Sequence, residues 1–202
     1  MTGKRKAAGR KAVVERKTKE TQIKCSLELD GAGESQVGTG VGFLDHMLEL
    51  LAFNAAWNLR LEAKGDLQVD EHHTVEDCAI ALGQALRKAI GETPVRRYGF
   101  FILPMDEALA TAAVDLGGRP FCKAELGLKR KEIGKMPSEL LEDFLIAFAN
   151  SAGAAVNLKA EGRNDHHKAE ACFKALGRAL EMACEKDAKR TGTSTKGRVK
   201  LK

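Results

Sequence analysis

Two short segments of the chain carry the same set of metal-binding side chains. Residues 72–76 read HHTVE and residues 166–170 read HHKAE, so four of the five histidines lie in two copies of His-His-x-x-Glu. Imidazole and carboxylate ligands without a thiolate suit a borderline-to-hard divalent ion, Mn²⁺ first, with Zn²⁺, Fe²⁺ or Co²⁺ as alternatives. Paired histidines can also cap helices or bind phosphate, but the second copy favours a metal site over that interpretation.

Neighbouring histidines on a helix cannot readily bind the same ion. Successive residues are turned by about 100° around the helix axis, so the rings of His72 and His73 diverge and Glu76 lies between them. Such a pair can serve two ions, one ring each, if the remaining ligands come from the other motif or from another subunit. The spacing therefore predicts a site with two ions.

The two motifs lie in related halves of the chain, which indicates an internal duplication. The segment LEDFLIAFANSAG resembles LDHMLELLAFNAA, and the residues after each motif share a cysteine and an Ala-Leu-Gly run at matching places. Aligning Ala149 with Ala52 places Asp143 opposite His46. Each half thus offers one further candidate ligand on an earlier helix.

Hydrophobic periodicity predicts the elements that position these residues. In the first half we expect a strand over 21–31, a helix over 43–55, a strand over 57–66 and a helix over 73–91, with a Gly-rich break after the first strand. The second half repeats this order. The pattern predicts an α/β fold made of two β-α-β-α halves.

Composition indicates a globular protein. The chain has 202 residues, 44% of them hydrophobic, which suits one large domain or two small ones packed closely. No apolar run is long enough to span a bilayer, and charges occupy the place of a signal peptide's apolar block, so we expect a cytosolic protein. The odd number of cysteines without CxxC spacing predicts reduced core residues, Cys25, Cys78, Cys122, Cys172 and Cys184.

Much of the net charge of +5 comes from the basic N-terminus. Such a tail can bind nucleic acid, but it has no aromatic residue for base stacking, so a solvated arm is the favoured interpretation. We divide the chain into a mobile basic arm (1–15), a first half (16–95), a second half (96–190) and a mobile C-terminal tail (191–202).

Five longer segments, taken in order, resemble the imidazoleglycerol-phosphate dehydratase family of histidine biosynthesis. They are GTGVGFLDHML, DEHHTVEDCAIALG, RYGFFILPMDEALATAAVDLGGRP, RNDHHKAEACFKALGRAL and STKG, and the match spans about residues 16–197. The resemblance implies a duplicated fold of the ribosomal protein S5 domain 2-like type, with sheets packed against helices. It also implies loss of water from D-erythro-imidazoleglycerol phosphate to give imidazole acetol phosphate, and a homo-oligomer built from trimers, a 24-mer in the family.

The resemblance also implies roles for individual residues. One Mn²⁺ ion would take His46, His73, Glu76 and His167, and a second would take His72, His166, Glu170 and Asp143, where some members have histidine at this last position. The substrate phosphate would be held by Arg97, Arg119, Lys174, Ser194 and Lys196. Glu20 is the first candidate for acid/base work and Asp106 the second. Each of these charges has the alternative of a structural or solvated role.

Two ions suit the chemistry of this reaction. The departing hydroxyl is on the carbon next to the imidazole ring, and the proton on the following carbon is only weakly acidic. Ions on both ring nitrogens would act as Lewis acids and as a template, while a carboxylate takes the proton. Two rival classes are a binuclear phosphatase or phosphodiesterase, which usually has more aspartates, and a non-catalytic metal-binding or nucleic-acid-associated protein, which leaves the phosphate-matching residues unexplained.

Overall fold

The computed structural model describes residues 9–188, and the two halves contain the same series of elements apart from one short hairpin. The first half consists of β1 (Lys11–Lys17), β2 (Thr21–Glu28), β3 (Ser35–Gly38), α1 (Gly42–Asn54), β4 (Asn58–Gly65) and α2 (His72–Ile90). The second consists of β5 (Tyr98–Met105), β6 (Ala108–Asp115), β7 (Phe121–Glu125), β8 (Glu132–Ile133), β9 (Met136–Pro137), α3 (Leu140–Ala152), β10 (Ala155–Glu161) and α4 (Asp165–Cys184). The short β8–β9 hairpin is an addition of the second half.

Each half forms one four-stranded sheet with the same strand order. The orders are β1-β2-β4-β3 and β5-β6-β10-β7, and in both sheets only the last pair is parallel. Alternation places Ile23, Cys25 and Leu27 of β2 on the buried face. The duplicated α/β architecture predicted from sequence is confirmed.

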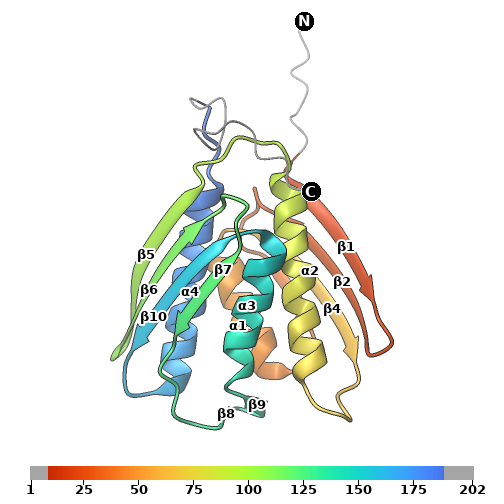
Figure 1. Ribbon diagram of the computed structural model, residues 1–202, viewed down its shortest axis with the longest axis vertical. Coiled ribbons are helices and arrows are strands. Elements are labelled where there is room, and N and C mark those ends of the chain that lie inside the picture. Colours follow the sequence, from red (N-terminus) through yellow and green to blue (C-terminus); the bar gives the residue numbers. More distant parts are fainter. Residues whose placement is uncertain (1–8, 189–202) are drawn as a thin grey trace, which may run out of the picture.

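The two sheets lie on the outside of the molecule, with the four helices between them (Figure 1). Helix α2 packs on the first sheet and α4 on the second. The shorter helices cross over to the other half, because α1 packs against α4 and α3 packs against α2. Each half therefore supplies one helix to the layer of the other.

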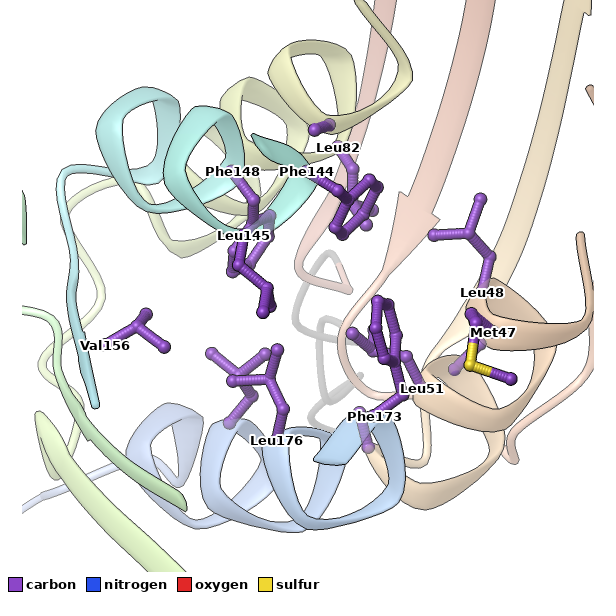
Figure 2. Close-up of a cluster of buried hydrophobic side chains, with 14 of the residues drawn as sticks. Met47, Leu48, Leu51, Leu82, Phe144, Leu145, Phe148, Val156, Phe173 and Leu176 are labelled. Atoms are coloured by element: carbon purple, nitrogen blue, oxygen red, sulfur yellow. The ribbon is translucent and has the colours of Figure 1, made fainter. Parts of the chain in front are cut away.

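One hydrophobic core joins the two halves. Figure 2 shows Phe144 and Phe148 of α3 facing Phe173 of α4, with Leu51 of α1 at the side. The rings of Phe144 and Phe148 are parallel within 3° at 6.4 Å, and Phe144 lies 5.6 Å from Phe173 between ring centroids. All four side chains are fully buried. The shared core means that the two halves form a single packed unit.

The N-terminal boundary drawn from sequence is wrong. The expected mobile arm of residues 1–15 overlaps β1, which pairs with β2 from Lys11 opposite Glu28 onward. Val14 of β1 is buried, and Glu15 pairs with Lys24 across the sheet at 3.0 Å, so the basic composition concealed an edge strand. Residues 191–202 lie outside the described part of the chain.

None of the five cysteines forms a disulfide. All five cysteines are free thiols and four are buried, while Cys122 is half-buried. Burial raises the pKa of Cys25 to about 12. Within residues 9–188, none of the helices has the length and apolar character of a bilayer span.

Two glycines at matching positions allow the crossed helices to approach closely. A Cβ on Gly83 of α2 would lie 2.7 Å from the carbonyl oxygen of Phe148 in α3. A Cβ on Gly177 of α4 would lie 2.7 Å from the carbonyl oxygen of Leu51 in α1. Because backbone atoms cannot move aside as a flexible side chain can, both helix pairs require glycine, which has no Cβ, at these two positions.

Gly83→Ala is therefore expected to lower the free energy of unfolding by about 1–3 kcal/mol through overpacking, although alanine is intrinsically better in a helix by about 1 kcal/mol. Thermal or urea unfolding of the metal-free chain would measure the change. Gly42→Ala is the matched control, since a Cβ on Gly42 meets nothing within 4 Å. A Gly83→Ala protein more stable than the parent would contradict the close approach.

Candidate metal centre

The two His-His-x-x-Glu motifs begin α2 and α4 at the same end of the molecule, where β8 and β9 also lie (Figure 1). The backbone N–H of His72 donates to the Asp70 carboxylate at 2.9 Å, and that of His166 donates to the Asn164 side chain at 3.0 Å. These bonds satisfy backbone donors that a helix start leaves without partners. Both motifs are thereby fixed at the first helical turn.

The neighbouring histidine rings diverge in both motifs, as the helical spacing predicts. The centroids of His72 and His73 are 6.1 Å apart with ring planes 78° apart. Those of His166 and His167 are 6.3 Å apart with an interplanar angle of 82°. Neither pair is arranged to bind one ion with both rings.

One three-residue cluster joins the two halves within the chain. Nε2 of His46 lies 3.0 Å from Oε1 of Glu170, and Nε2 of His166 lies 2.9 Å from the same oxygen. The ligand atoms of the three residues all lie within 4.8 Å of one another. Among residues 9–188 no other group of three or more His, Cys, Asp or Glu side chains comes this close. Two imidazoles and a carboxylate form a donor set that fits Mn²⁺ or a similar divalent ion.

A second, looser pair forms on the opposite helix pair. Nδ1 of His72 on α2 lies 3.8 Å from Oδ2 of Asp143 on α3, and both side chains are nearly half exposed. Glu76 is exposed on the same face of α2, one turn beyond His72. The sequence placed His72 and Asp143 together, and the structure does so within a single chain.

The grouping of His46 within one chain differs from the ligand set in which the sequence interpretation placed it. The sequence interpretation grouped His46 with His73, Glu76 and His167, but His46 lies against His166 and Glu170. The reason is the crossed helix packing, which brings α1 of the first half to α4 of the second. Sequence alignment could match positions in the two halves, but it could not show that the first helix of each half packs against the second helix of the other half.

His73 and His167 turn away from these clusters and toward carboxylates that the sequence analysis missed. Nδ1 of His73 lies 3.1 Å from Oδ2 of Asp66, and Nδ1 of His167 lies 2.8 Å from Oε2 of Glu107. Asp66 raises the pKa of His73, Glu107 raises that of His167, and His167 in turn lowers the pKa of Glu107 to about 2. Only the place of Glu107 beside Asp106 in the sequence could have drawn attention to it.

The two acid/base candidates occupy corresponding turns next to these outward histidines. Glu20 is exposed in the turn between β1 and β2, and its charge contributes to the raised pKa of His73. Asp106 is in the turn between β5 and β6, with φ of 48°, and its Oδ2 lies 3.6 Å from Nε2 of His167. Asp106 thus stands beside His167, and Glu20 is near enough to His73 for its charge to act on that ring.

Lys174 lies directly at the three-residue cluster. Its Nζ is 2.5 Å from Oε2 of Glu170 and 3.2 Å from Sδ of Met105. Burial raises the pKa of Glu170, but hydrogen bonds from Lys174, His46 and His166 outweigh it and hold this pKa at about 2. Glu170 is therefore ionised and able to act as a ligand at neutral pH.

The other predicted phosphate contacts are not near this cluster in one chain. The backbone N–H of Arg97 donates to the carbonyl of Ala183, at the far end of α4 and about 25 Å along the helix from His166, at about 1.5 Å per residue. The Arg97 guanidinium binds both oxygens of Asp115 at 2.6 and 2.9 Å. Arg119 is exposed close to the same corner and forms no ion pair with another described residue. Ser194 and Lys196 lie outside the described residues.

Comparison with known proteins identifies the family. The family model described as imidazoleglycerol-phosphate dehydratase matches residues 39–180. The imidazoleglycerol-phosphate dehydratase of Geobacter metallireducens is 49% identical over 94% of this chain and 99% of its own length. The chain belongs to the imidazoleglycerol-phosphate dehydratase family. The resemblance seen in the sequence is thereby confirmed.

Further relatives agree on pathway and fold. A histidine biosynthesis bifunctional protein of Stenotrophomonas maltophilia is 51% identical over 87% of this chain, which spans 49% of that relative. The crystal structure of imidazoleglycerol-phosphate dehydratase from Staphylococcus aureus has a TM-score of 0.79 and 36% identity, and the match covers 88% of this chain and 99% of that one. The chain is a hydro-lyase of histidine biosynthesis, and neither rival class weighed from sequence is supported.

In this dehydratase-family chain, a buried ion pair fixes the loop beside His166. Nζ of Lys168 lies 2.7 Å from Oδ1 of Asp165 and also donates to the carbonyl of Gly127. Oδ2 of Asp165 accepts the backbone N–H groups of Lys129 and Arg130, both at 2.7 Å. Burial raises the pKa of Asp165, but Lys168 and these backbone donors outweigh it and lower this pKa to about 2. The pair ties the loop after β7 to the start of α4.

Lys168→Met is expected to lower the free energy of unfolding by about 3 kcal/mol, because it leaves a buried carboxylate without its partner. The effect should be complete at pH 7. A depressed carboxyl pKa stabilises the fold above the ordinary value of 3.8, and this contribution is lost only as the pH falls toward 2. Urea unfolding would measure it.

The matched control is the double variant Asp165→Asn with Lys168→Met. It should cost less than the sum of the two single variants, because no buried charge is left unpaired. Additive costs would show that the pair is not coupled.

Proposed function

We propose that this chain removes water from D-erythro-imidazoleglycerol phosphate with two Mn²⁺ ions per chain, each held between neighbouring subunits. The observation that carries the proposal is the incompleteness of the ligand sets in one chain. His46, His166 and Glu170 converge, His72 and Asp143 approach each other, and the two remaining imidazoles face elsewhere.

The outward histidines complete these sets in a neighbouring subunit. Each has its Nδ1 occupied by a carboxylate, which leaves Nε2 to bind an ion outside its own chain. We assign His73 of a neighbouring subunit to the cluster of His46, His166 and Glu170. By the internal duplication, His167 of a neighbouring subunit then joins His72, Glu76 and Asp143.

The chain's own carboxylates carry out the proton transfer. When bound, the ions supply Lewis-acid activation of the imidazole ring and a template for the substrate. Glu20 accepts the proton of the carbon beside the hydroxyl-bearing one, and the electron pair of that C–H bond forms the C=C bond of the enol as the C–O bond breaks. The departing hydroxyl takes up a proton from the resulting carboxylic acid and leaves as water, which regenerates the carboxylate. The enol then tautomerises to the ketone imidazole acetol phosphate. Asp106, beside His167, is the second candidate for the same exchange.

The substrate phosphate is held by cations from more than one chain. Lys174 stands at the metal cluster, whereas Arg97 and Arg119 lie toward the other end of α4. Arginine offers paired donors to phosphate, and each charge-assisted bond contributes about 1.5–3 kcal/mol. Arg119 is exposed and without an ion pair among residues 9–188, which favours it over Arg97 as the primary contact. Ser194 and Lys196 complete the proposed cradle.

The same proposal covers assembly and location. A site shared between subunits requires a closed homo-oligomer, and we propose a 24-mer built from trimers. Five free thiols suit the cytosol, which we propose as its compartment.

Dialysis against a chelator is expected to abolish formation of imidazole acetol phosphate and to reduce the particle to smaller units, because bridging ligands lose their ions. Mn²⁺ should restore both, with metal analysis near two ions per chain. Product assay and light scattering on the same samples would test this. Full turnover by a metal-free preparation, or by a monomer, would refute the shared site.

Asp143→Ala is expected to lower the Mn²⁺ content and the turnover together, because it removes a proposed ligand. Asp143→His should retain much of both, since imidazole is also a competent ligand. Metal analysis and steady-state kinetics would distinguish this role from that of a solvated helix carboxylate. Asp143→Ala protein with two ions per chain would remove Asp143 from the ligand set.

Glu20→Gln and Arg119→Ala should separate proton transfer from phosphate binding. Loss of a general base is expected to lower kcat by about 100-fold or more with unchanged metal content. Loss of the guanidinium should instead raise KM by about 10-fold or more, in line with a lost charge-assisted bond. The opposite pattern in steady-state kinetics would mean that the two roles are reversed.

A further inference from the structure

Two carboxylates outside the proposed ligand sets face the outward histidines in a way that fixes the place of a proton. A neutral imidazole carries one N–H, and an ionised carboxylate can only accept a hydrogen bond. Nδ1 of His73 lies 3.1 Å from Asp66, and Nδ1 of His167 lies 2.8 Å from Glu107. In both rings the proton must therefore be on Nδ1, which leaves a lone pair on Nε2.

We propose that Asp66 and Glu107 are positioning residues, which hold His73 and His167 in the tautomer whose Nε2 binds an ion of the neighbouring subunit. This inference rests on the proposed function, since it concerns the two imidazoles that a second chain would use. A carboxylate on the distal nitrogen also fixes the direction of the ring and strengthens it as a ligand. Neither residue touches substrate or metal itself.

The surroundings of the two carboxylates differ, which makes the proposal sharply testable. Oε1 of Glu107 accepts the backbone N–H of Asn164 at 2.7 Å, while Oε2 accepts from His167. Both oxygens are committed, so the side chain cannot turn over. The Asp66 carboxylate faces His73 with both oxygens, at 3.1 and 3.3 Å, and no other hydrogen bond to it is described among residues 9–188.

Replacing each carboxylate by its amide should therefore have different effects. In Glu107→Gln, the amide oxygen must remain opposite the N–H of Asn164, so the amide NH₂ faces Nδ1 of His167. That NH₂ donates a hydrogen bond, which requires a bare Nδ1 and moves the ring proton to Nε2. The nitrogen needed for the metal is then blocked. In Asp66→Asn, the free amide can turn its oxygen toward His73, and the original tautomer is retained.

The first measurement is the tautomer itself. In metal-free protein labelled with ¹⁵N-histidine, the pH is raised until the ring ¹⁵N shifts stop changing, so that the imidazoles are neutral, and NMR then distinguishes the protonated ring nitrogen from the bare one. We expect an Nδ1–H form for His167 in the parent, an Nε2–H form in Glu107→Gln, and an unchanged His73 in Asp66→Asn. A His167→Gln sample assigns the signal. An unchanged tautomer in Glu107→Gln would overturn the proposal.

The second measurement is Mn²⁺ affinity by competition with a chelator. Glu107→Gln should lower the Mn²⁺ affinity of one of the two sites by about 10- to 100-fold, which is the usual effect of losing the hydrogen-bond partner of a metal-bound histidine. Asp66→Asn should lower the affinity less. Glu161→Gln is the control, because Glu161 is an exposed carboxylate paired with Lys159 on β10. Equal affinity of Glu107→Gln and the parent would also overturn the inference.

These results separate a positioning role from a purely structural one. Gln at this position keeps the hydrogen bond to Asn164, so the thermal unfolding of the metal-free variant should match the parent. The outcome also separates the inference from the proposed function. A parent that binds no Mn²⁺ would refute the shared metal site whatever the tautomers are, whereas a parent with two ions and an unaffected Glu107→Gln would refute only the role of Glu107.

Discussion

The crossing of α1 over α4 and of α3 over α2 is the constraint on which the rest of this molecule depends. Two glycines, Gly83 and Gly177, permit the close approach of the backbones, and the shared aromatic core around Phe144 fills the space between the pairs. Because α1 packs on α4 of the second half and α3 packs on α2 of the first half, removing either half would expose the helices of the other. The same exchange sets the chemistry, since His46 reaches His166 and Glu170 only through it.

Helical geometry then determines what a single chain leaves unfinished. Adjacent residues cannot point in one direction on a helix, so His73 and His167 must leave the clusters that their neighbours help to form. Asp66 and Glu107 stabilise these outward rings, and the turns that carry Glu20 and Asp106 stand beside them. In the proposed assembly, a pair of ligands that diverges in one chain serves two subunits, and the functional unit is larger than the folded unit.

The duplication is not symmetrical in its charges. Lys174 neutralises the buried Glu170, whereas the corresponding place in the first half is Ile80 and the corresponding Glu76 is exposed. The second half also contains the β8–β9 hairpin, and the loop before this hairpin is tied to α4 through Asp165 and Lys168. The two halves therefore share a fold and a ligand pattern, while the electrostatic surroundings of the two proposed ions differ.

The sequence by itself determined the duplication, the α/β class, the divergence of the paired histidines and the family, because these follow from local periodicity and from long, specific motifs. It also matched His72 with Asp143. It could not show which helices pack together, so it did not foresee that His46 lies against His166 and Glu170 within one chain, or that Arg97 and Lys174 lie apart along α4. It read residues 11–15 as an arm because charge on an edge strand resembles a solvated tail. Hydrogen-bond partners such as Glu107 and His167 are 60 residues apart, and only the tertiary structure brings them together. Such contacts depend on how the elements pack against one another, so they produce no periodic pattern in the sequence from which they could be predicted.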